Sequence, residues 1–194
     1  VPQIQEFALV QRVVSPFTKM SEDNTPADWT RMAAACHEEL IKPEVKGVVL
    51  THGTDTLHYT AAALSFMLRN LGKPVVLVGS QRSSDRGSTD AILNLTCAAR
   101  AAISDVAEVG ICMHATTSDD YCIFIRGTSV RKMHAARRDA FRSINRVPLA
   151  RVWGNGKIEI GPDVHMRPSR QDATQLDNVF DENIALVKTF PGMP

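Results

Sequence analysis

The stretch VKGVVLTHGTDTLHYTAAALSFMLRNLGKPVVLVG, residues 45–79, decides the fold class. Residues 45–51 form a short apolar run, rich in β-branched side chains, that is typical of a buried strand in a parallel sheet. Residues 56–71 carry apolar side chains at helical spacing, and Gly72 follows them as a stop signal. Residues 74–79 repeat the strand pattern. The stretch therefore predicts a strand, a helix and a second strand in succession.

The neighbouring segments continue this alternation. Residues 89–103 show helical spacing and residues 109–113 form another apolar run. Upstream, Thr25-Pro26-Ala27-Asp28 is typical of a helix start and predicts a helix from Pro26 to about Ile41. Strands alternating with helices predict an α/β fold, with a mainly parallel sheet covered by helices on both faces in a flavodoxin-like, three-layer arrangement.

The last third of the chain changes character. Asn155-Gly156 predicts a type I′ hairpin turn between strands at residues 149–153 and 157–160. Residues 183–189 predict one more strand. We expect a large α/β domain over residues 1–161, a linker over 162–183 and the start of a smaller domain over 184–194.

Composition excludes several classes of protein. The 194 residues are 44% hydrophobic and 22% charged, which suits one globular core, and the default interpretation is a cytoplasmic domain. A formal net charge of +1 gives no general reason to expect nucleic acid or an anionic membrane as partner. No apolar run approaches the roughly 20 residues of a membrane span.

Metal and redox chemistry are not favoured. The cysteines lack metal-ligand spacing and lie in apolar stretches, which predicts reduced core residues at positions 36, 97, 112 and 122. The histidines lack the helical pair with an acid that zinc hydrolases use. We therefore expect no metal site.

Two loops are expected to form the site, because ligands of open parallel sheets bind beyond the carboxyl ends of the strands. Residues 52–56 combine a glycine, two hydroxyl groups and a carboxylate at a helix start. Residues 80–88 form a polar loop without a recognised phosphate-binding pattern, so a nucleotide site is less favoured. The competing interpretation is that Thr54, Asp55 or Thr56 merely caps the following helix.

A threonine hydroxyl needs a base to take its proton, and a lysine can serve. Arg131-Lys132 offers candidates, within a segment from Arg126 to Arg151 that holds eight basic residues and the single acid Asp139. Most of these basic residues are expected to form a solvated or phosphate-facing surface. Spacing alone does not select Lys132.

Residues 49–56, VLTHGTDT, resemble the second signature of the asparaginase/glutaminase family. The resemblance continues through residues 74–82 (PVVLVGSQR) and 130–132 (VRK), and spans nearly the whole chain. It implies the fold of an asparaginase N-terminal domain. Residues 58–66, 81–86 and 137–142 are similar to one branch of the family, the D subunits of archaeal glutamyl-tRNA(Gln) amidotransferases.

The resemblance implies roles for the site residues. Thr54 matches the second active-site threonine, Asp55 its neighbour that contacts the substrate amino group, and Lys132 the base or electrostatic partner. These roles suit the chemistry, since Asp55 supplies a negative charge for an α-ammonium group.

Three more positions match substrate-binding residues of the family. Ser21 and Glu22 match the pair that contacts the α-carboxylate and α-amino groups of the amino acid. Ser80 matches a small residue whose backbone carbonyl faces the side-chain amide.

The resemblance also implies an activity and partners. A protein of this branch hydrolyses glutamine, and its partner, the amidotransferase E subunit, uses the ammonia to amidate glutamate on tRNA(Gln). ATP and magnesium are expected on that partner, with no cofactor in this chain, and tRNA is expected to bind mainly through the partner. A homodimer within a heterotetramer is implied.

The family pattern is incomplete in this sequence. The glycine-rich first motif, which supplies the primary nucleophile, has no match before Ser21, and the remainder of the smaller domain does not follow Pro194. We therefore expect a central fragment that is inactive alone. The alternatives are a free-standing L-asparaginase, a non-catalytic amino-acid-binding module and a flavodoxin-like nucleotide binder.

Overall fold

The protein is described by a computed structural model over residues 2–168 and 174–193. Its helices are α1 (Pro2–Gln5), α2 (Pro26–Leu40), α3 (Leu57–Met67) and α4 (Ala91–Ala102), and 3₁₀ turns occur at η1 (Ser21–Asp23) and η2 (Gly127–Ser129). The strands are β1 (Val48–Thr51), β2 (Leu68–Arg69), β3 (Val75–Val78), β4 (Val109–His114), β5 (Cys122–Arg126), β6 (Val130–Lys132), β7 (Phe141–Ser143), β8 (Ala150–Val152), β9 (Ile158–Ile160) and β10 (Gln175–Leu176).

The main sheet has the strand order β1-β3-β4-β5-β8-β9. Strands β1, β3 and β4 pair in parallel, with Val48 beside Val75 and Val75 beside Val109. The other pairings, from β4 to β9, are antiparallel. The loop between β4 and β5 is shorter than the dozen or more residues that a parallel crossover needs, so the chain turns straight back. The sheet is therefore mixed, with a parallel core.

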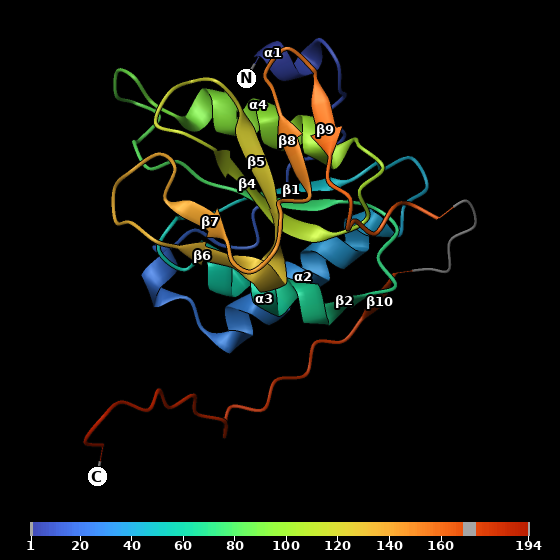
Figure 1. The fold of residues 1–194 in the computed structure, drawn as a ribbon. Coiled ribbons are helices and arrows are strands. Elements are labelled where there is room, and N and C mark those ends of the chain that lie inside the picture. Colours follow the sequence, from blue (N-terminus) through green and yellow to red (C-terminus); the bar gives the residue numbers. More distant parts are fainter. Residues whose placement is uncertain (1, 169–173, 194) are drawn as a thin grey trace.

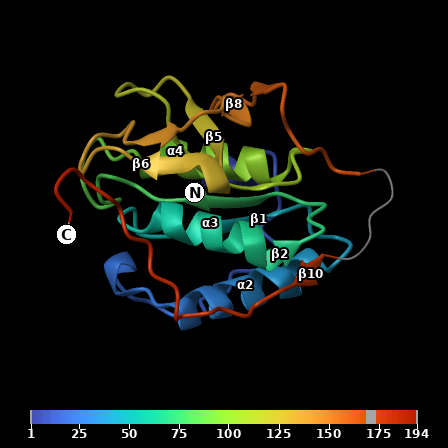
Figure 2. The same cartoon turned by 60° about the horizontal axis from the view of Figure 1, so that its bottom comes forward.

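Helices cover both faces of this sheet. Figures 1 and 2 show α2 and α3 on one face and α4 on the other. Every residue of β3 and β4 is buried, which explains why the two strands are apolar without alternation as far as His114 at the end of β4. The predicted α/β class with helices on both faces is confirmed.

Helix α2 begins and ends as predicted. The Asp28 carboxylate accepts hydrogen bonds from the backbone N–H of Thr25 (2.9 Å) and from its hydroxyl (2.8 Å). The helix runs to Leu40, with Ile41 as its C-cap. The capping pattern in the sequence was sufficient because its partners lie three residues apart.

Helix α3 ends at Met67, four residues before the expected end at Leu71. Leu68 and Arg69 leave the helix to form β2, which pairs antiparallel with β10. The backbone N–H of Asp177 adds a hydrogen bond to the Met67 carbonyl (2.8 Å). A partner more than a hundred residues away thus overrides the local stop signal at Gly72.

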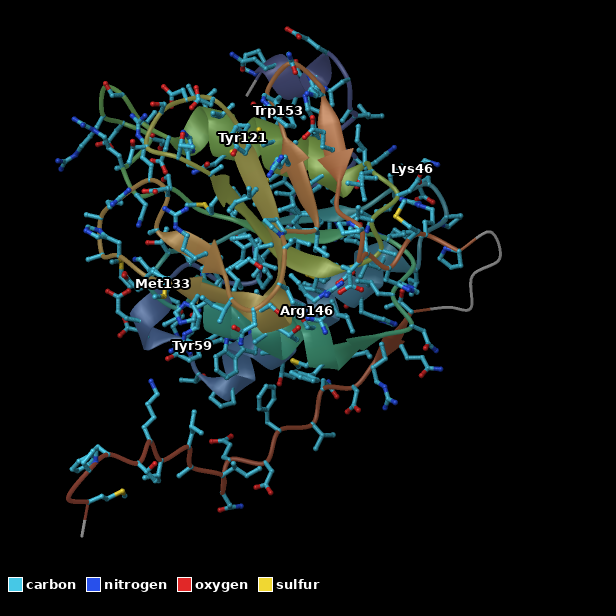
Figure 3. All side chains as sticks on the ribbon, viewed as in Figure 1. Lys46, Tyr59, Tyr121, Met133, Arg146 and Trp153 are labelled. Atoms are coloured by element: carbon cyan, nitrogen blue, oxygen red, sulfur yellow. The ribbon has the colours of Figure 1, made fainter. Side chains whose placement is uncertain are left out.

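The predicted hairpin is formed by β8 and β9, but the turn type was wrong. Within the turn, only Gly156 has a positive φ, +104°, whereas a type I′ turn needs two such residues. The Gly156 N–H donates to the Trp153 carbonyl (3.1 Å), and the Trp153 N–H donates to the Lys157 carbonyl (2.9 Å). This is a three-residue loop with glycine in the left-handed position. Trp153 stacks on Tyr121, with ring centroids 5.0 Å apart (Figure 3).

The strand predicted over residues 183–189 is not formed, and that prediction was wrong. These residues pair with no other strand of the described chain, and Ile184 and Leu186 are strongly exposed. A single extended segment leaves its backbone groups to water and has no partner to stabilise it. Phe180, which precedes these residues, contacts Trp29 (ring centroids 5.5 Å apart). Figure 1 shows the C-terminal tail running away from the sheet.

The cysteines are free and buried, as predicted: Cys36, Cys97, Cys112 and Cys122. In the described parts of the chain, no helix is both long enough and apolar enough to cross a membrane. Nor do the described residues contain a cluster of three or more histidine, cysteine or acidic side chains that would suit a metal ion.

Candidate functional site

The site lies where the parallel strands β1 and β3 end. Thr51 pairs with Val78, so the loops that follow the two strands start side by side. They approach closely at Gly79, where a β-carbon would lie 2.7 Å from the His52 carbonyl oxygen and 3.0 Å from the Thr54 methyl group. Only glycine fits at this position without displacing the loop that carries Thr54.

The structure brings Thr54, Asp55 and Lys132 together. The Lys132 ammonium donates to the Thr54 hydroxyl (2.9 Å) and to the Asp55 carboxylate (2.8 Å). The Lys132 side chain is only 9% exposed, whereas Asp55 is 62% exposed and keeps most of its carboxylate open to solvent. Among the eight basic residues of the segment, tertiary contact thus selects Lys132.

The competing capping interpretation was wrong. Thr56 is the N-cap residue of α3 by position, but no side chain hydrogen-bonds to the helix start. Its hydroxyl donates to the Ser21 carbonyl instead (2.6 Å), while Thr54 and Asp55 contact Lys132. None of the three residues Thr54, Asp55 and Thr56 therefore caps the helix with its side chain.

Turn η1 brings Ser21 beside the same loop. A β-carbon on Gly53 would lie 2.8 Å from the Ser21 hydroxyl oxygen, so the two residues are in direct contact. That hydroxyl is buried and, in the described structure, has no hydrogen-bond partner. The neighbouring Glu22 is exposed. Ser21 is thus a buried donor beside the loop of Thr54 that a ligand could satisfy.

Ser80 is half-buried and lies just after the carboxyl end of β3, where the sequence predicts a loop. The residue that contacts Thr54 is the next one, Gln81. The Gln81 carbonyl oxygen Oε1 accepts a hydrogen bond from the Thr54 hydroxyl (2.9 Å). Sequence analysis did not single out Gln81. Its position directly after Ser80, in a loop already expected to face the ligand, was the available signal.

His52 is a second residue that sequence analysis passed over. Its Nδ1 lies 2.6 Å from the Gly53 carbonyl, which can only accept, so Nδ1 carries the hydrogen. Its Nε2 lies 2.9 Å from both the Asn24 amide nitrogen and the Thr60 hydroxyl. Burial lowers the pKa of His52, and the bond to Gly53 opposes this. Neutral His52 therefore ties the loop to η1 and α3.

The basic segment is largely paired. Arg126 bonds to Glu108 at 2.5 Å and Arg138 to Asp119 at 2.9 Å. Arg137 and Arg142 both contact Asp139, the one acid of the segment. Much of the positive charge is therefore offset by nearby acids, among them Glu108 and Asp119 from other parts of the chain.

Comparison with known proteins identifies the family of this chain. The family description "Asparaginase, N-terminal" matches residues 1–164, which include every predicted site residue. The chain belongs to the asparaginase family. The asparaginase-type fold is also found in the solved L-asparaginase of Thermococcus kodakarensis, with 32% identity, a TM-score of 0.77 and coverage of 89% of this chain and 49% of that one. L-asparaginase I of Vibrio cholerae gives 31% identity and a TM-score of 0.76 over 91% of this chain and 50% of its own.

Two curated relatives are more similar to this chain in sequence than these solved structures are. The glutamyl-tRNA(Gln) amidotransferase D subunit of Pyrococcus furiosus is 53% identical over all of this chain and 43% of its own length. The corresponding protein of Methanothermobacter thermautotrophicus is 47% identical over 99% of this chain and 43% of its own. The chain thus spans less than half the length of these relatives.

Proposed function

We propose that this chain carries part of the glutamine-hydrolysing site of a tRNA-dependent amidotransferase. The observation that carries the proposal is the Lys132 ammonium bonded to both Thr54 and Asp55. The 53% identity with an amidotransferase D subunit, against 32% with a solved L-asparaginase, favours glutamine over asparagine as substrate. The product ammonia would serve to convert Glu-tRNA(Gln) to Gln-tRNA(Gln).

The reaction breaks the C–N bond of the side-chain amide and joins the oxygen of water to the acyl carbon. The amide nitrogen leaves as ammonia, so a proton must be removed on one side and delivered on the other. Thr54 and Lys132 share a hydrogen bond of 2.9 Å and form a pair through which such a proton can move. Lys132 acts as the base or as the electrostatic partner of that step.

The remaining site residues bind the amino acid. Asp55 presents a largely exposed carboxylate that suits the α-ammonium group. The unpartnered hydroxyl of Ser21 suits the α-carboxylate, and the exposed Glu22 beside it offers a second charge for the α-ammonium. The Ser80 carbonyl faces the side-chain amide.

We assign residues 1–161 to the large domain, 162–183 to a linker and 184–194 to the start of a smaller domain. The partner, the amidotransferase E subunit, supplies ATP and magnesium binding and most of the tRNA contact, and this chain needs no cofactor of its own. The assembly is a homodimer within a heterotetramer. Its reaction belongs to protein synthesis, which places it in the cytoplasm.

A second candidate is a free-standing L-asparaginase, favoured by the TM-score of 0.77 with the Thermococcus kodakarensis enzyme. A protein of that kind would prefer asparagine and respond to neither tRNA nor partner. A non-catalytic amino-acid-binding module is the alternative from another class, and it would bind glutamine without releasing ammonia.

The test measures ammonia release by the complete gene product from glutamine and from asparagine, with and without the E subunit and Glu-tRNA(Gln). We expect glutamine hydrolysis that the partner and tRNA accelerate. We expect Thr54→Val and Lys132→Met to lower kcat at least about 100-fold, the range that acid–base catalysis contributes. Asparagine hydrolysis indifferent to tRNA would select the second candidate, and glutamine binding without ammonia release would select the binding module.

Matched controls separate chemistry from folding. Lys157→Met removes an exposed lysine on the hairpin, and Thr128→Val removes an exposed threonine of η2. Both controls should keep the kcat of the parent protein. Equal losses in a control and its matched site variant would show that the loss reflects folding.

A further inference from the structure

Both polar atoms of the Gln81 side-chain amide make hydrogen bonds. Its Oε1 accepts the Thr54 hydroxyl (2.9 Å), and its Nε2 donates to the Arg137 carbonyl (2.9 Å). The two contacts fix the orientation of the amide, because the flipped amide would set its oxygen against a carbonyl that can only accept. Gln81 therefore presents an acceptor to Thr54.

This orientation decides which way the Thr54 hydroxyl points. Its hydrogen is directed to Gln81, so an oxygen lone pair is left for the Lys132 ammonium, 2.9 Å away. The Thr54 methyl group is fixed separately, since it lies over Gly79. Without an acceptor at position 81, the hydroxyl hydrogen is free to rotate among its staggered positions.

The backbone of Gln81 is anchored to a fully buried carboxylate. Asp90 accepts hydrogen bonds from the backbone N–H groups of Gln81 and Arg82, each at 2.9 Å. Asn94 donates to the same carboxylate (3.0 Å) and to the Gly79 carbonyl (3.0 Å). One turn at the start of α4 thus fixes the backbone on both sides of Ser80.

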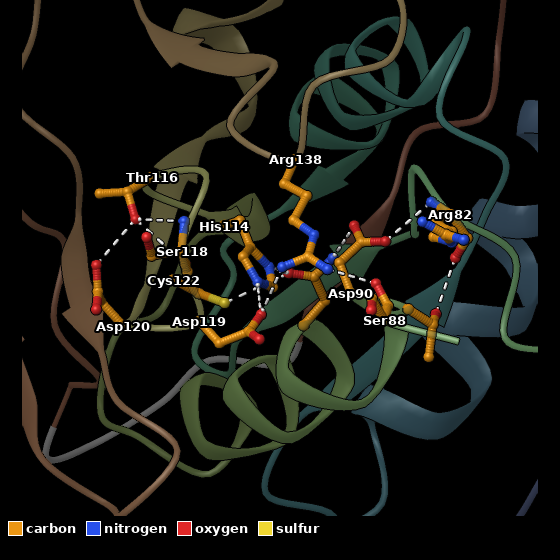
Figure 4. Close-up of polar contacts among 12 residues, drawn as sticks. Arg82, Ser88, Asp90, His114, Thr116, Ser118, Asp119, Asp120, Cys122 and Arg138 are labelled. Atoms are coloured by element: carbon orange, nitrogen blue, oxygen red, sulfur yellow. Dashed lines mark hydrogen bonds and ion pairs between the residues drawn. The ribbon is translucent and has the colours of Figure 1, made fainter. Parts of the chain in front are cut away.

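The loop that receives the Gln81 side chain is anchored by the same cluster (Figure 4). The amide oxygen of Asn94 lies 2.6 Å from Nδ1 of buried His114, whose Nε2 lies 3.0 Å from Asp119. Asp119 also accepts from Arg138 (2.9 Å), the residue next to Arg137. A continuous polar chain therefore fixes both the backbone of Gln81 and the carbonyl that its side chain meets.

We propose that Gln81 is a positioning residue that takes the hydroxyl hydrogen of Thr54 while Lys132 is an ammonium group, and so keeps the oxygen lone pair of Thr54 facing Lys132. The inference rests on the proposed role of Thr54 and Lys132 in amide hydrolysis. The polar chain runs from the buried residues Asp90, Asn94 and His114 to the exposed Asp119, and each group in it has a hydrogen-bond partner. The geometry it fixes here is that of Thr54.

The experiment compares two substitutions at position 81 in the complete gene product with the E subunit. Gln81→Met keeps the length of the side chain and removes the acceptor, so kcat for glutamine should fall about 10- to 100-fold while KM changes less than about threefold. Gln81→Glu places a negative charge one hydrogen bond beyond Thr54. The added charge should change the pH dependence of kcat, which a loss of packing alone would not do.

Arg82→Met is the matched control, since Arg82 is the exposed neighbour in the same loop. It should leave kcat and its pH profile unchanged. A change confined to KM would make Gln81 a substrate contact and overturn the inference, as would a normal kcat in Gln81→Met. Melting temperatures within a few degrees of the parent separate positioning from loss of fold.

A measurement without turnover keeps the inference separate from the proposed function. The surroundings of Lys132 can be followed by NMR of lysine labelled with ¹³C at the ε-carbon, with its signal assigned through Lys132→Met. Gln81→Glu should move the chemical shift of that signal at a fixed pH, and Arg82→Met should not. An unmoved signal would overturn the positioning role, whereas a parent protein that releases no ammonia would overturn only the proposed function.

Discussion

The Lys132 ammonium lies 2.9 Å from the Thr54 hydroxyl, although 78 residues separate them in the chain. Lys132 reaches this position because η2, just before β6, packs against α3 at Gly127. A β-carbon there would lie 2.6 Å from the Ala61 carbonyl oxygen and 2.5 Å from the Ser65 hydroxyl. The missing side chain of Gly127 thus allows the approach that sets the lysine beside the loop after β1.

Gly127→Ala should therefore disturb the site from a distance. The added methyl group meets backbone, so η2 must move away from α3 at a cost of about 1–3 kcal/mol, as for other overpacked positions. This shift also moves Lys132. We expect kcat to fall by a larger factor than KM rises. Thermal unfolding and steady-state kinetics check both effects. A variant as stable and active as the parent would show that the contact can relax locally.

Lys132→Arg separates the two roles open to Lys132. The guanidinium group keeps the positive charge but cannot give up its proton at any usable pH. If Lys132 acts as the base, we expect kcat to fall at least about 100-fold, as in Lys132→Met. Kinetics of both variants across pH give the answer. An arginine variant that retains most of the activity would assign Lys132 an electrostatic role.

Ser21→Ala should change binding without changing stability. The Ser21 hydroxyl makes no hydrogen bond in the described structure, so its removal breaks no internal contact, and stability should stay within about 0.5 kcal/mol. If the hydroxyl binds the α-carboxylate, KM for glutamine should rise about tenfold, the worth of one hydrogen bond to a charged group. Ser84→Ala, in an exposed loop, is the control. An unchanged KM would remove Ser21 from the site.

The neutral state of His52 predicts a pH dependence of stability. Burial lowers its pKa in the folded protein, so the unfolded chain takes up the proton first. Stability should therefore be constant above the ordinary histidine pKa of about 6.5 and fall as the pH drops below it. His52→Gln keeps an acceptor for Thr60 but cannot titrate, so it should show a smaller loss.

Melting temperatures at pH 7.5 and pH 5.5 test this prediction. The difference between the parent and His52→Gln isolates His52 from the other groups that titrate in this range. The same loss in both proteins would mean that protonation of His52 does not disturb its bonds to Asn24 and Thr60.

Short sequence patterns predicted the helices and strands whose boundaries depend only on residues close in sequence. The start and end of α2 followed from residues within one turn of Thr25 and from the helical spacing after it. The buried strands β1, β3 and β4 followed from apolar runs, because a strand covered on both faces carries no polar alternation. The early end of α3 did not follow, because β2 depends on pairing with distant β10.

Sequence alone predicted the α/β class and the two candidate loops, and the family resemblance proposed Thr54, Asp55 and Lys132, which the structure brings into contact. Only the tertiary structure decided which basic side chain meets Thr54, and that Gln81 and His52 hold the loop. The physical reason is that hydrophobic periodicity acts over a few residues and is visible in any short window. Hydrogen bonds such as Lys132 to Thr54 join atoms whose separation is fixed only when the sheet, α3 and η2 pack together.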